Sequence, residues 1–198
     1  ASGINYSNII GYSGYNRTDV VIPETAPNGT TLTKINESAF RYLNLKGTIT
    51  IPDSVTSIGS LAFALNELSD VNNGSGDTEY APFVYARKSG GGFDKTNILS
   101  YAGYGTNNVV VPEGVVTLSS YSFYYTYIKG VTLPESLKSI GSYSFQICKL
   151  NGTVVIPKNV TFIGTKAFEK SISWNGFNDG LTTIVNKTPN AFDWKNIT

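Results

Sequence analysis

The chain repeats one short motif several times, and this internal repeat limits its possible folds more than any other feature. The motif reads TITIPDSVTSIGSLAF from residue 48, VTLPESLKSIGSYSF from residue 131 and TVVIPKNVTFIGTKAF from residue 153. A phenylalanine preceded by Ala or Ser closes each unit, and these residues are 22 to 24 positions apart except for one step of 60. They are Phe40, Phe63, Phe123, Phe145, Phe168 and Phe192. This period predicts a solenoid, because one such unit cannot bury its apolar side chains alone.

The residues of one unit, 48–68, have separate structural roles. Ile49 and Ile51 alternate with threonines, which predicts a short half-buried strand. Pro52 ends that strand because proline has no N–H for a ladder. Gly59 is expected to allow a tight turn after a second extended piece, and Phe63 to fill the interior. The same choices recur in the other units.

The step of 60 residues contains one repeat and about 37 further residues. The added part begins with the loop-like stretch NNGSGDTEYAP and continues as FVYARKSGGGFDKTNILSYAG. The second stretch alternates on both sides of a glycine cluster, which predicts a β-hairpin inserted at about 76–104.

The two ends of the chain resemble parts of further units. Segment 9–24, IIGYSGYNRTDVVIPE, aligns with 98–113, ILSYAGYGTNNVVVPE, with eight of sixteen positions identical. We therefore expect the N-terminus to be the second arm of an earlier hairpin. GLTTIVNKTPNAFDW starts another unit and stops, so the chain is expected to be a fragment of a longer array. Its opening, ASG, lacks the basic start and apolar centre of a signal peptide, which indicates a mature or trimmed chain.

Composition narrows the possible chemistry. The chain has no histidine, one cysteine, and a net charge of +1 from 15 basic and 14 acidic residues. Histidine-based catalysis and histidine metal ligation are therefore excluded, and Cys148 cannot form an intramolecular disulfide. The balanced charge predicts no nucleic-acid partner, and the lack of a long apolar run predicts no membrane insertion. We expect no cofactor and no metal, and no constellation of side chains indicates a catalytic site.

The pattern IxIPxSVTxIGxxAF at a period near 23 resembles the BspA-like class of leucine-rich repeats (leucine-rich repeat 5 type). Such repeats occur largely in surface proteins of bacteria and some protists. The resemblance covers five clear units and a partial sixth. It implies a curved right-handed solenoid outside the cell that serves in binding or adhesion, and it identifies no ligand.

Two departures from the family pattern stand out. The third unit reads LSSYSF in place of IGSLAF, so its turn lacks the glycine. The family often places cysteine three residues after AF, and here only Cys148 follows that rule, as a buried apolar residue of the repeat. The other residues at that position are Leu43, Asn66, Thr126 and Ser171.

We therefore predict a β-rich right-handed solenoid, a leucine-rich-repeat superhelix with short parallel strands, little helix and an inserted β-hairpin. Residues 1–198 are predicted to form one such domain. The predicted repeats are roughly 16–47, 48–71, 104–130, 131–152 and 153–175, with a partial repeat at 181–198.

Candidate binding residues fall where the repeats vary. Alternate residues of the first strands should form a continuous, weakly polar outer ridge, and four tyrosines replace ordinary residues in YSFYYTY. The candidates are Val21, Thr48, Thr50, Val110, Thr132, Val155, Tyr121, Tyr124, Tyr125, Tyr127 and Phe162.

Each candidate also has a purely structural interpretation. The β-branched ridge residues are good strand formers, and the tyrosines are expected to pack against Tyr101 and Tyr104 of the hairpin. Phe162 stands where other units have solvent-suited residues, and is expected to be covered by SISWNGFNDG with its Trp174.

The sequence thus predicts a non-enzymatic, monomeric, secreted or cell-surface module that binds an extracellular protein or glycan through a solenoid face. Two alternatives remain open at this point. One is a structural spacer, which should be uniformly polar. The other is an accessory repeat domain of a larger secreted or cell-wall enzyme.

Overall fold

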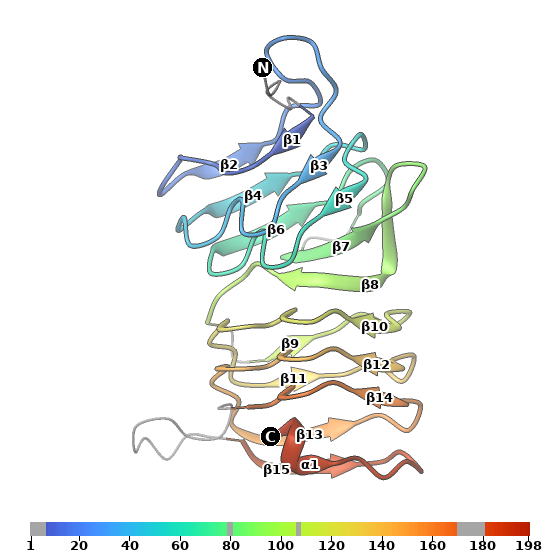
Figure 1. Cartoon of the computed structure of the whole chain (residues 1–198). Coiled ribbons are helices and arrows are strands. Elements are labelled where there is room, and N and C mark those ends of the chain that lie inside the picture. Colours follow the sequence, from blue (N-terminus) through green and yellow to red (C-terminus); the bar gives the residue numbers. More distant parts are fainter. Residues whose placement is uncertain (1–6, 79–80, 106–107, 170–180) are drawn as a thin grey trace.

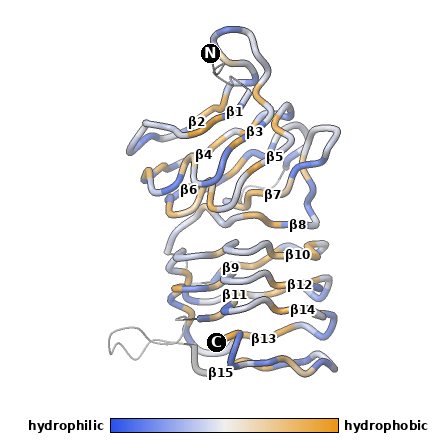
Figure 2. The backbone as a smooth tube through the Cα atoms, viewed as in Figure 1, coloured by the Kyte–Doolittle hydropathy of each residue, from blue (hydrophilic) through white to orange (hydrophobic). Residues whose placement is uncertain are grey.

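The chain forms a stack of coils, with the N-terminal coils at the top of Figure 1 and the C-terminal coils at the bottom. The computed structural model describes residues 7–78, 81–105, 108–169 and 181–198. Each complete coil contains two short strands on different sides of the stack, so strands from successive coils form two series. Apolar stretches fall on the strands and recur from coil to coil (Figure 2). The predicted β-rich solenoid with little helix is confirmed.

The first strand of each coil contributes to one series, which we call the strand face. Its strands are β2 (Thr18–Val21), β4 (Lys46–Thr50), β6 (Glu67–Asn72), β9 (Val109–Val110), β11 (Val131–Thr132), β13 (Gly152–Ile156) and β15 (Leu181–Asn186). They pair in parallel as β2-β4-β6, β9-β11 and β13-β15.

The second strand of each coil contributes to the other series. Its strands are β1 (Asn8–Ile9), β3 (Lys34–Ile35), β5 (Ser57–Ile58), β8 (Phe93–Tyr101), β10 (Thr117–Leu118), β12 (Ser139–Ile140) and β14 (Phe162–Ile163). They pair in parallel as β1-β3-β5 and β8-β10-β12-β14. The chain ends in a short helix, α1 (Trp194–Ile197). No helix in the described part of the chain is both long and apolar enough to cross a bilayer.

The aromatic residues that close the units stack on one another through the interior. Neighbouring ring centroids are 4.9 to 5.3 Å apart, with interplanar angles of 10 to 28°. The stacks are Tyr12–Phe40–Phe63 and Tyr101–Phe123–Phe145–Phe168. Tyr12 and Tyr101 lie at matching positions of the two aligned segments, and each begins a stack.

Phe192 differs from the other residues that were expected to close a unit. It is half-buried, and its ring meets Trp194 edge-on at 5.8 Å. In the described part of the chain the stack ends at Phe168, whose N–H donates to the carbonyl of Ile197 at 2.8 Å. The buried Ile197 of α1 thus closes this end of the core.

The regular spacing of the repeat glycines has a different cause from the one expected. Gly59 is not in the left-handed region, but a Cβ there would lie 2.3 Å from the backbone nitrogen of Glu37 in the preceding coil. Gly141 approaches Ser120 of its preceding coil in the same way, at 2.4 Å. The glycine is therefore needed for coil-to-coil contact. In the unit without it, the hydroxyl of Ser119 donates to Oδ1 of Asn97 in β8, at 2.9 Å.

The predicted hairpin is confirmed: β7 (Phe83–Arg87) pairs antiparallel with β8. It lies between the N-terminal and C-terminal coils (Figure 1). Its side chains alternate between the two core clusters. Val84 and Ala102 are buried in the N-terminal cluster, whereas Phe83, Tyr85 and Ile98 are buried in the C-terminal cluster. The hairpin therefore lies between the two core clusters and is buried on both faces.

The second arm of the hairpin is at the same time a strand of the array. Ile98 of β8 pairs in parallel with Leu118, as Ile9 of β1 pairs with Ile35. The aligned segments 9–24 and 98–113 thus begin at equivalent places in their coils. A first arm before residue 7 would lie outside the described residues.

The guanidinium of Arg87 fixes the hairpin to the N-terminal coils. It donates to the carbonyls of Val55 (2.8 Å), Asn73 (2.6 Å) and Pro52 (3.0 Å). Asn73 is itself buried and donates through Nδ2 to the carbonyl of Phe83 at 2.9 Å. Two polar side chains thus bind the hairpin to the coils through hydrogen bonds to backbone carbonyls.

Replacing Arg87 should loosen the hairpin. We expect Arg87→Met to lower the free energy of unfolding by about 2–3 kcal/mol, because charged hydrogen bonds are lost and the carbonyls of Val55 and Asn73 lose their side-chain donor. Hydrogen exchange should quicken in 83–101 before it quickens in β12 or β14. Lys88→Met, at the exposed next position, is the control and should have little effect. Equal exchange in both variants would contradict this role for Arg87.

A buried asparagine organises the turn after Phe63. Nδ2 of Asn66 donates to the carbonyls of Phe40 (2.7 Å) and Phe63 (2.8 Å). Its Oδ1 accepts from the backbone N–H groups of Leu43 (3.2 Å) and Leu45 (3.1 Å). One side chain therefore satisfies four backbone groups of two coils, and it does so with 1% of its surface exposed.

Thr126 and Cys148 occupy the position of Asn66 in later coils, and each satisfies a backbone carbonyl as Asn66 does. Both donate to the carbonyl of Phe123, each at 2.9 Å. Burial raises the pKa of the Cys148 thiol to about 12, so the sulfur keeps the proton that it donates. The prediction that Cys148 is a buried residue of the repeat is confirmed.

Candidate binding surfaces

Large apolar side chains are exposed mainly on two surfaces of the described chain. On the strand face they are four valines: Val21 (72% exposed), Val110 (63%), Val155 (37%) and Val185 (39%). On the turn after the aromatic stack they are three tyrosines: Tyr15 (59%), Tyr42 (72%) and Tyr104 (46%). Grouping of this kind marks candidate interaction surfaces, whereas single exposed apolar residues are ordinary.

The exposed valines stand in register across the strand face. Val21 pairs with Thr50, and Thr50 pairs with Asn72. In the C-terminal coils, Val110 pairs with Thr132, and Val155 pairs with Val185. The alternation of each strand places these residues outward because their neighbours, such as Val20 and Val154, are buried.

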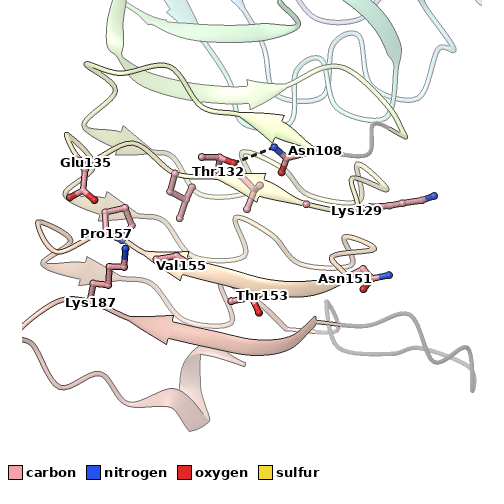
Figure 3. Close-up of a pocket in the computed structure, with 12 residues that line it drawn as sticks. Asn108, Lys129, Thr132, Glu135, Asn151, Thr153, Val155, Pro157 and Lys187 are labelled. Atoms are coloured by element: carbon pink, nitrogen blue, oxygen red, sulfur yellow. Dashed lines mark hydrogen bonds between the residues drawn. The ribbon is translucent and has the colours of Figure 1, made fainter.

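A hollow of about 590 Å³ lies on the C-terminal part of the strand face. Thr132, Thr153 and Val155 line its middle (Figure 3). Asn108 donates through Nδ2 to the hydroxyl of Thr132 at 3.2 Å, which closes one side. The middle of the hollow therefore offers methyl groups, hydroxyls and an amide, and it holds no charge.

Charged side chains lie at the two ends of this hollow. Lys129 is at one end together with Asn151, and Glu135 is at the other end with Lys187 (Figure 3). All four are exposed. Their arrangement confines charge to the rim, which is the usual anatomy of a protein interface.

The N-terminal part of the strand face differs from the expected weakly polar ridge. Thr48 and Thr50 are half-buried, and the N–H of Thr48 donates to Oδ1 of Asp19 at 2.8 Å. Strand β6, which the repeat spacing did not reveal, places Asp70 opposite Thr48. Burial raises the pKa of the Asp70 carboxyl above its ordinary value. Valine and threonine thus dominate only the C-terminal part.

The second surface is a channel that we call the tyrosine groove. It consists of two adjoining cavities of about 370 and 580 Å³, which share Tyr42, Leu65 and Tyr125. Tyr15, Tyr104 and Tyr127 line the first, and Tyr124 and Arg41 line the second. The groove therefore joins side chains from the N-terminal coils to side chains from the coils beyond the hairpin.

The turn geometry of each coil directs these side chains outward. The residue two positions after the aromatic stack adopts a left-handed backbone in several coils, with φ of 57° at Tyr42, 61° at Leu65 and 59° at Tyr125. Non-glycine residues rarely adopt this conformation, so its recurrence at one position identifies it as part of the coil. The same position therefore lines the groove in successive coils.

The four tyrosines predicted as candidates pack partly on one another. Tyr125 and Tyr127 meet at 5.0 Å and 79°, and Tyr127 also meets Tyr104 at 5.0 Å. Tyr121 stacks on Tyr143 at 5.0 Å and meets Tyr124 edge-on at 5.7 Å. The expected packing against Tyr104 is thus present, but Tyr101 stacks on Phe123 inside the core. Tyr124, Tyr125 and Tyr127 are half-buried and still line the groove.

Burial raises the pKa of Tyr127 above its ordinary value, and a side-chain hydrogen bond with Tyr125 raises it further. The Nζ of Lys149 lies 4.6 Å from the centre of the Tyr127 ring. The Tyr127 phenol therefore stays neutral across the physiological pH range, and its hydroxyl is engaged with Tyr125.

The sequence candidates did not include Tyr15 and Tyr42, although two signals point to them. Tyr15 and Tyr104 are identical positions of the aligned segments 9–24 and 98–113. Tyr42 and Tyr125 both follow their stacked phenylalanine by two residues. Comparing the tyrosines position by position between coils would have placed all four on one side of the array.

Phe162 lies on β14, the outermost strand of its series. It pairs with Ser139, as expected from the alignment of the units, and 54% of its surface is exposed. The segment expected to cover it, 171–180 with Trp174, lies outside the described residues. Phe162 belongs neither to the strand face nor to the tyrosine groove.

No group of three or more cysteine, aspartate and glutamate side chains is placed to hold a metal in the described ranges. Valine, threonine and tyrosine side chains are prominent on the two described surfaces. The molecule is a repeat protein whose stacked coils present extended surfaces.

The chain belongs to the BspA type leucine-rich repeat family. The family model for the BspA type leucine rich repeat region matches six copies, over residues 10–89 and 95–198. The resemblance noted from the sequence is thereby confirmed. A comparison with curated protein sequences gave no match.

Three solved structures share the fold. The pneumococcal vaccine antigen PcpA is 22% identical, with a TM-score of 0.50, and the match covers 87% of this chain and 51% of that one. A leucine rich cell surface protein from Faecalibacterium prausnitzii is 23% identical, with a TM-score of 0.50, and the match covers 92% of this chain and 50% of that protein. A leucine-rich repeat protein from Eubacterium ventriosum is 22% identical, with a TM-score of 0.56, and the match covers 80% of this chain and 46% of that protein. The chain therefore spans about half the length of these proteins.

Proposed function

We infer that the chain is a non-enzymatic binding module of a secreted or cell-surface protein and that it holds an extracellular macromolecule on its strand face. The observation that carries this proposal is the set of exposed residues around the hollow in the C-terminal part of the strand face: Val110, Thr132, Val155 and Val185. The family and the cell-surface protein among the structural matches support the extracellular setting.

The physical argument rests on exposed apolar area without nearby charge. Fully covering an exposed valine stabilises a complex by about 1.5–3 kcal/mol before association costs are subtracted. Val155 and Thr132 lie at the uncharged middle of the hollow, while Lys129, Glu135 and Lys187 are at its ends. A partner with a complementary apolar ridge and a polar margin fits this arrangement, whereas a spacer has no need of it.

A charge placed in the middle of the hollow should abolish binding without unfolding the chain. We expect Val155→Glu and Thr132→Glu each to weaken capture on arrays of extracellular-matrix proteins and glycans by about tenfold or more, because the partner would have to bury an unpaired charge. Both side chains are exposed, so the urea midpoint should change little.

Thr161→Glu is the matched control, because Thr161 is an exposed threonine next to β14 in the other strand series. This variant should bind like the parent chain. The proposal fails if the parent captures nothing above micromolar background. It also fails if all three variants lose binding equally.

A further inference from the structure

The tyrosine groove is a second surface, separate from the strand face, and its shape indicates the class of ligand that it suits. Its rings do not form a flat platform. Tyr125 and Tyr127 stand at 79° to each other, and Tyr104 and Tyr127 at 42°. Inclined rings offer a compact prolyl ring contacts with more than one aromatic face, whereas a larger pyranose ring stacks best on a single flat aromatic face.

We propose that the tyrosine groove binds a proline-rich segment in the polyproline II conformation that carries an acidic residue beside its prolines. This inference goes beyond the binding proposed for the strand face and does not depend on it. Aromatic-lined grooves are the general solution for holding such segments, because prolyl rings pack on the aromatic faces and the ligand is already ordered before it binds.

The repeat distance of the coils suits such a ligand. Coils stack about 4.8 Å apart where their strands pair, so two coils span about 9.6 Å. One turn of polyproline II contains three residues and advances about 9.3 Å. Successive turns of the ligand can thus meet equivalent positions of every second coil within the N-terminal coils or within the coils beyond the hairpin, which interrupts the strand pairing between these two parts.

The tyrosine hydroxyls supply the hydrogen bonds that such a ligand needs. A polyproline II segment makes no internal hydrogen bonds, so its carbonyls are free to accept. The exposed Tyr15, Tyr42 and Tyr104 present phenol groups at the groove. Tyrosine provides this contact at a small entropic cost because it has only two side-chain torsions.

The charges at the groove explain the acidic residue. Glu67 is balanced by Lys46, whose Nζ lies 3.2 Å from its carboxylate. The half-buried guanidinium of Arg41 has no hydrogen-bond or ion-pair partner among the described residues, and Lys149 lies above Tyr127. The groove therefore has a positive margin that is not neutralised by the chain itself, and a ligand carboxylate would pair with Arg41.

The test uses two fluorescein-labelled peptides, a decaproline flanked by glutamate and the same decaproline flanked by lysine. Fluorescence anisotropy with the full chain should show binding of the glutamate peptide and about tenfold weaker binding of the lysine peptide. Tyr42→Ala and Tyr104→Ala should each weaken the glutamate peptide by about tenfold. Both residues are exposed, and Tyr104→Phe provides a milder variant in which only the hydroxyl is lost.

Three further variants test whether Arg41 sets the charge preference and whether the peptide lies in the groove. Arg41→Glu should reverse the preference between the two peptides, whereas Phe162→Ala, which removes an exposed aromatic outside the groove, should bind normally. Val155→Glu should also bind normally, so failure of the strand-face proposal leaves this result unchanged. The inference is overturned if neither peptide binds at millimolar concentration. It is equally overturned if a β-linked oligosaccharide binds with the same tyrosine dependence and the peptides do not.

Discussion

Replacing Phe123 with alanine is expected to lower the free energy of unfolding by about 3–5 kcal/mol, the range found when a buried phenylalanine is truncated in a core. The Phe123 ring is fully buried and stacks on Tyr101 at 5.3 Å and on Phe145 at 4.9 Å. It also meets Phe83 of the hairpin at 6.4 Å. Its loss therefore leaves a cavity at the junction between the hairpin and the C-terminal coils.

Urea unfolding followed by circular dichroism measures this effect. Phe162→Ala is the matched control, because the same truncation on an exposed ring should change stability by no more than about 0.5 kcal/mol. Phe123→Leu should fall between the two. A loss below about 1 kcal/mol for Phe123→Ala would show that the aromatic stack is not the main support of the array.

Replacing Asn66 with alanine is expected to lower the free energy of unfolding by about 3–5 kcal/mol, although the change removes little apolar area. Two backbone N–H groups and two carbonyls would lose their partner inside the core, and each buried unsatisfied group costs about 1–3 kcal/mol. The shape of the turn between Phe40 and Leu45 depends on these bonds, so partial relaxation should keep the total below the full sum.

Asn66→Cys is an informative second variant, because cysteine occupies the equivalent position at residue 148. The Cys148 thiol donates to one carbonyl, that of the preceding coil's phenylalanine, whereas the Asn66 amide donates to two carbonyls and accepts from two backbone N–H groups. We therefore expect Asn66→Cys to lose less stability than Asn66→Ala and more than the control, Asn159→Ala. Asn159 is exposed and makes one hydrogen bond, to the carbonyl of Glu135 at 2.7 Å. Equal stability of all three variants would refute the bridging role of Asn66.

The repeat predicted much of the interior correctly. Ile49, Ile51 and Phe63 are fully buried, and the phenylalanines that close the units stack as expected through Phe168. These predictions succeed because burial in a coil depends on the alternation of apolar and polar residues and on the closing aromatic residue. Both features are present in the sequence of each unit. The hairpin was also predicted, since alternation on both sides of a glycine cluster is a local signal.

Features that depend on contacts between distant segments were not predicted. The spacing gave no indication that the hairpin divides the core, because its two faces are both apolar and only their surroundings distinguish them. The role of Asn66 was missed because a polar residue in a family position for cysteine gives no sign of four backbone partners. Gly59 was recognised but explained by turn geometry, whereas the approach of the preceding coil is the cause.

The period of the array, the short strand before each repeat proline and the side chains that fill each coil can be derived from the sequence. All of these follow from short-range patterns that each unit repeats. Only the tertiary structure decided which variable residues meet. Tyr15, Tyr42 and Tyr127 line one groove because stacked coils with left-handed turns bring equivalent positions together across 112 residues of sequence. Val155 and Val185 likewise become exposed neighbours only when β13 and β15 pair in register.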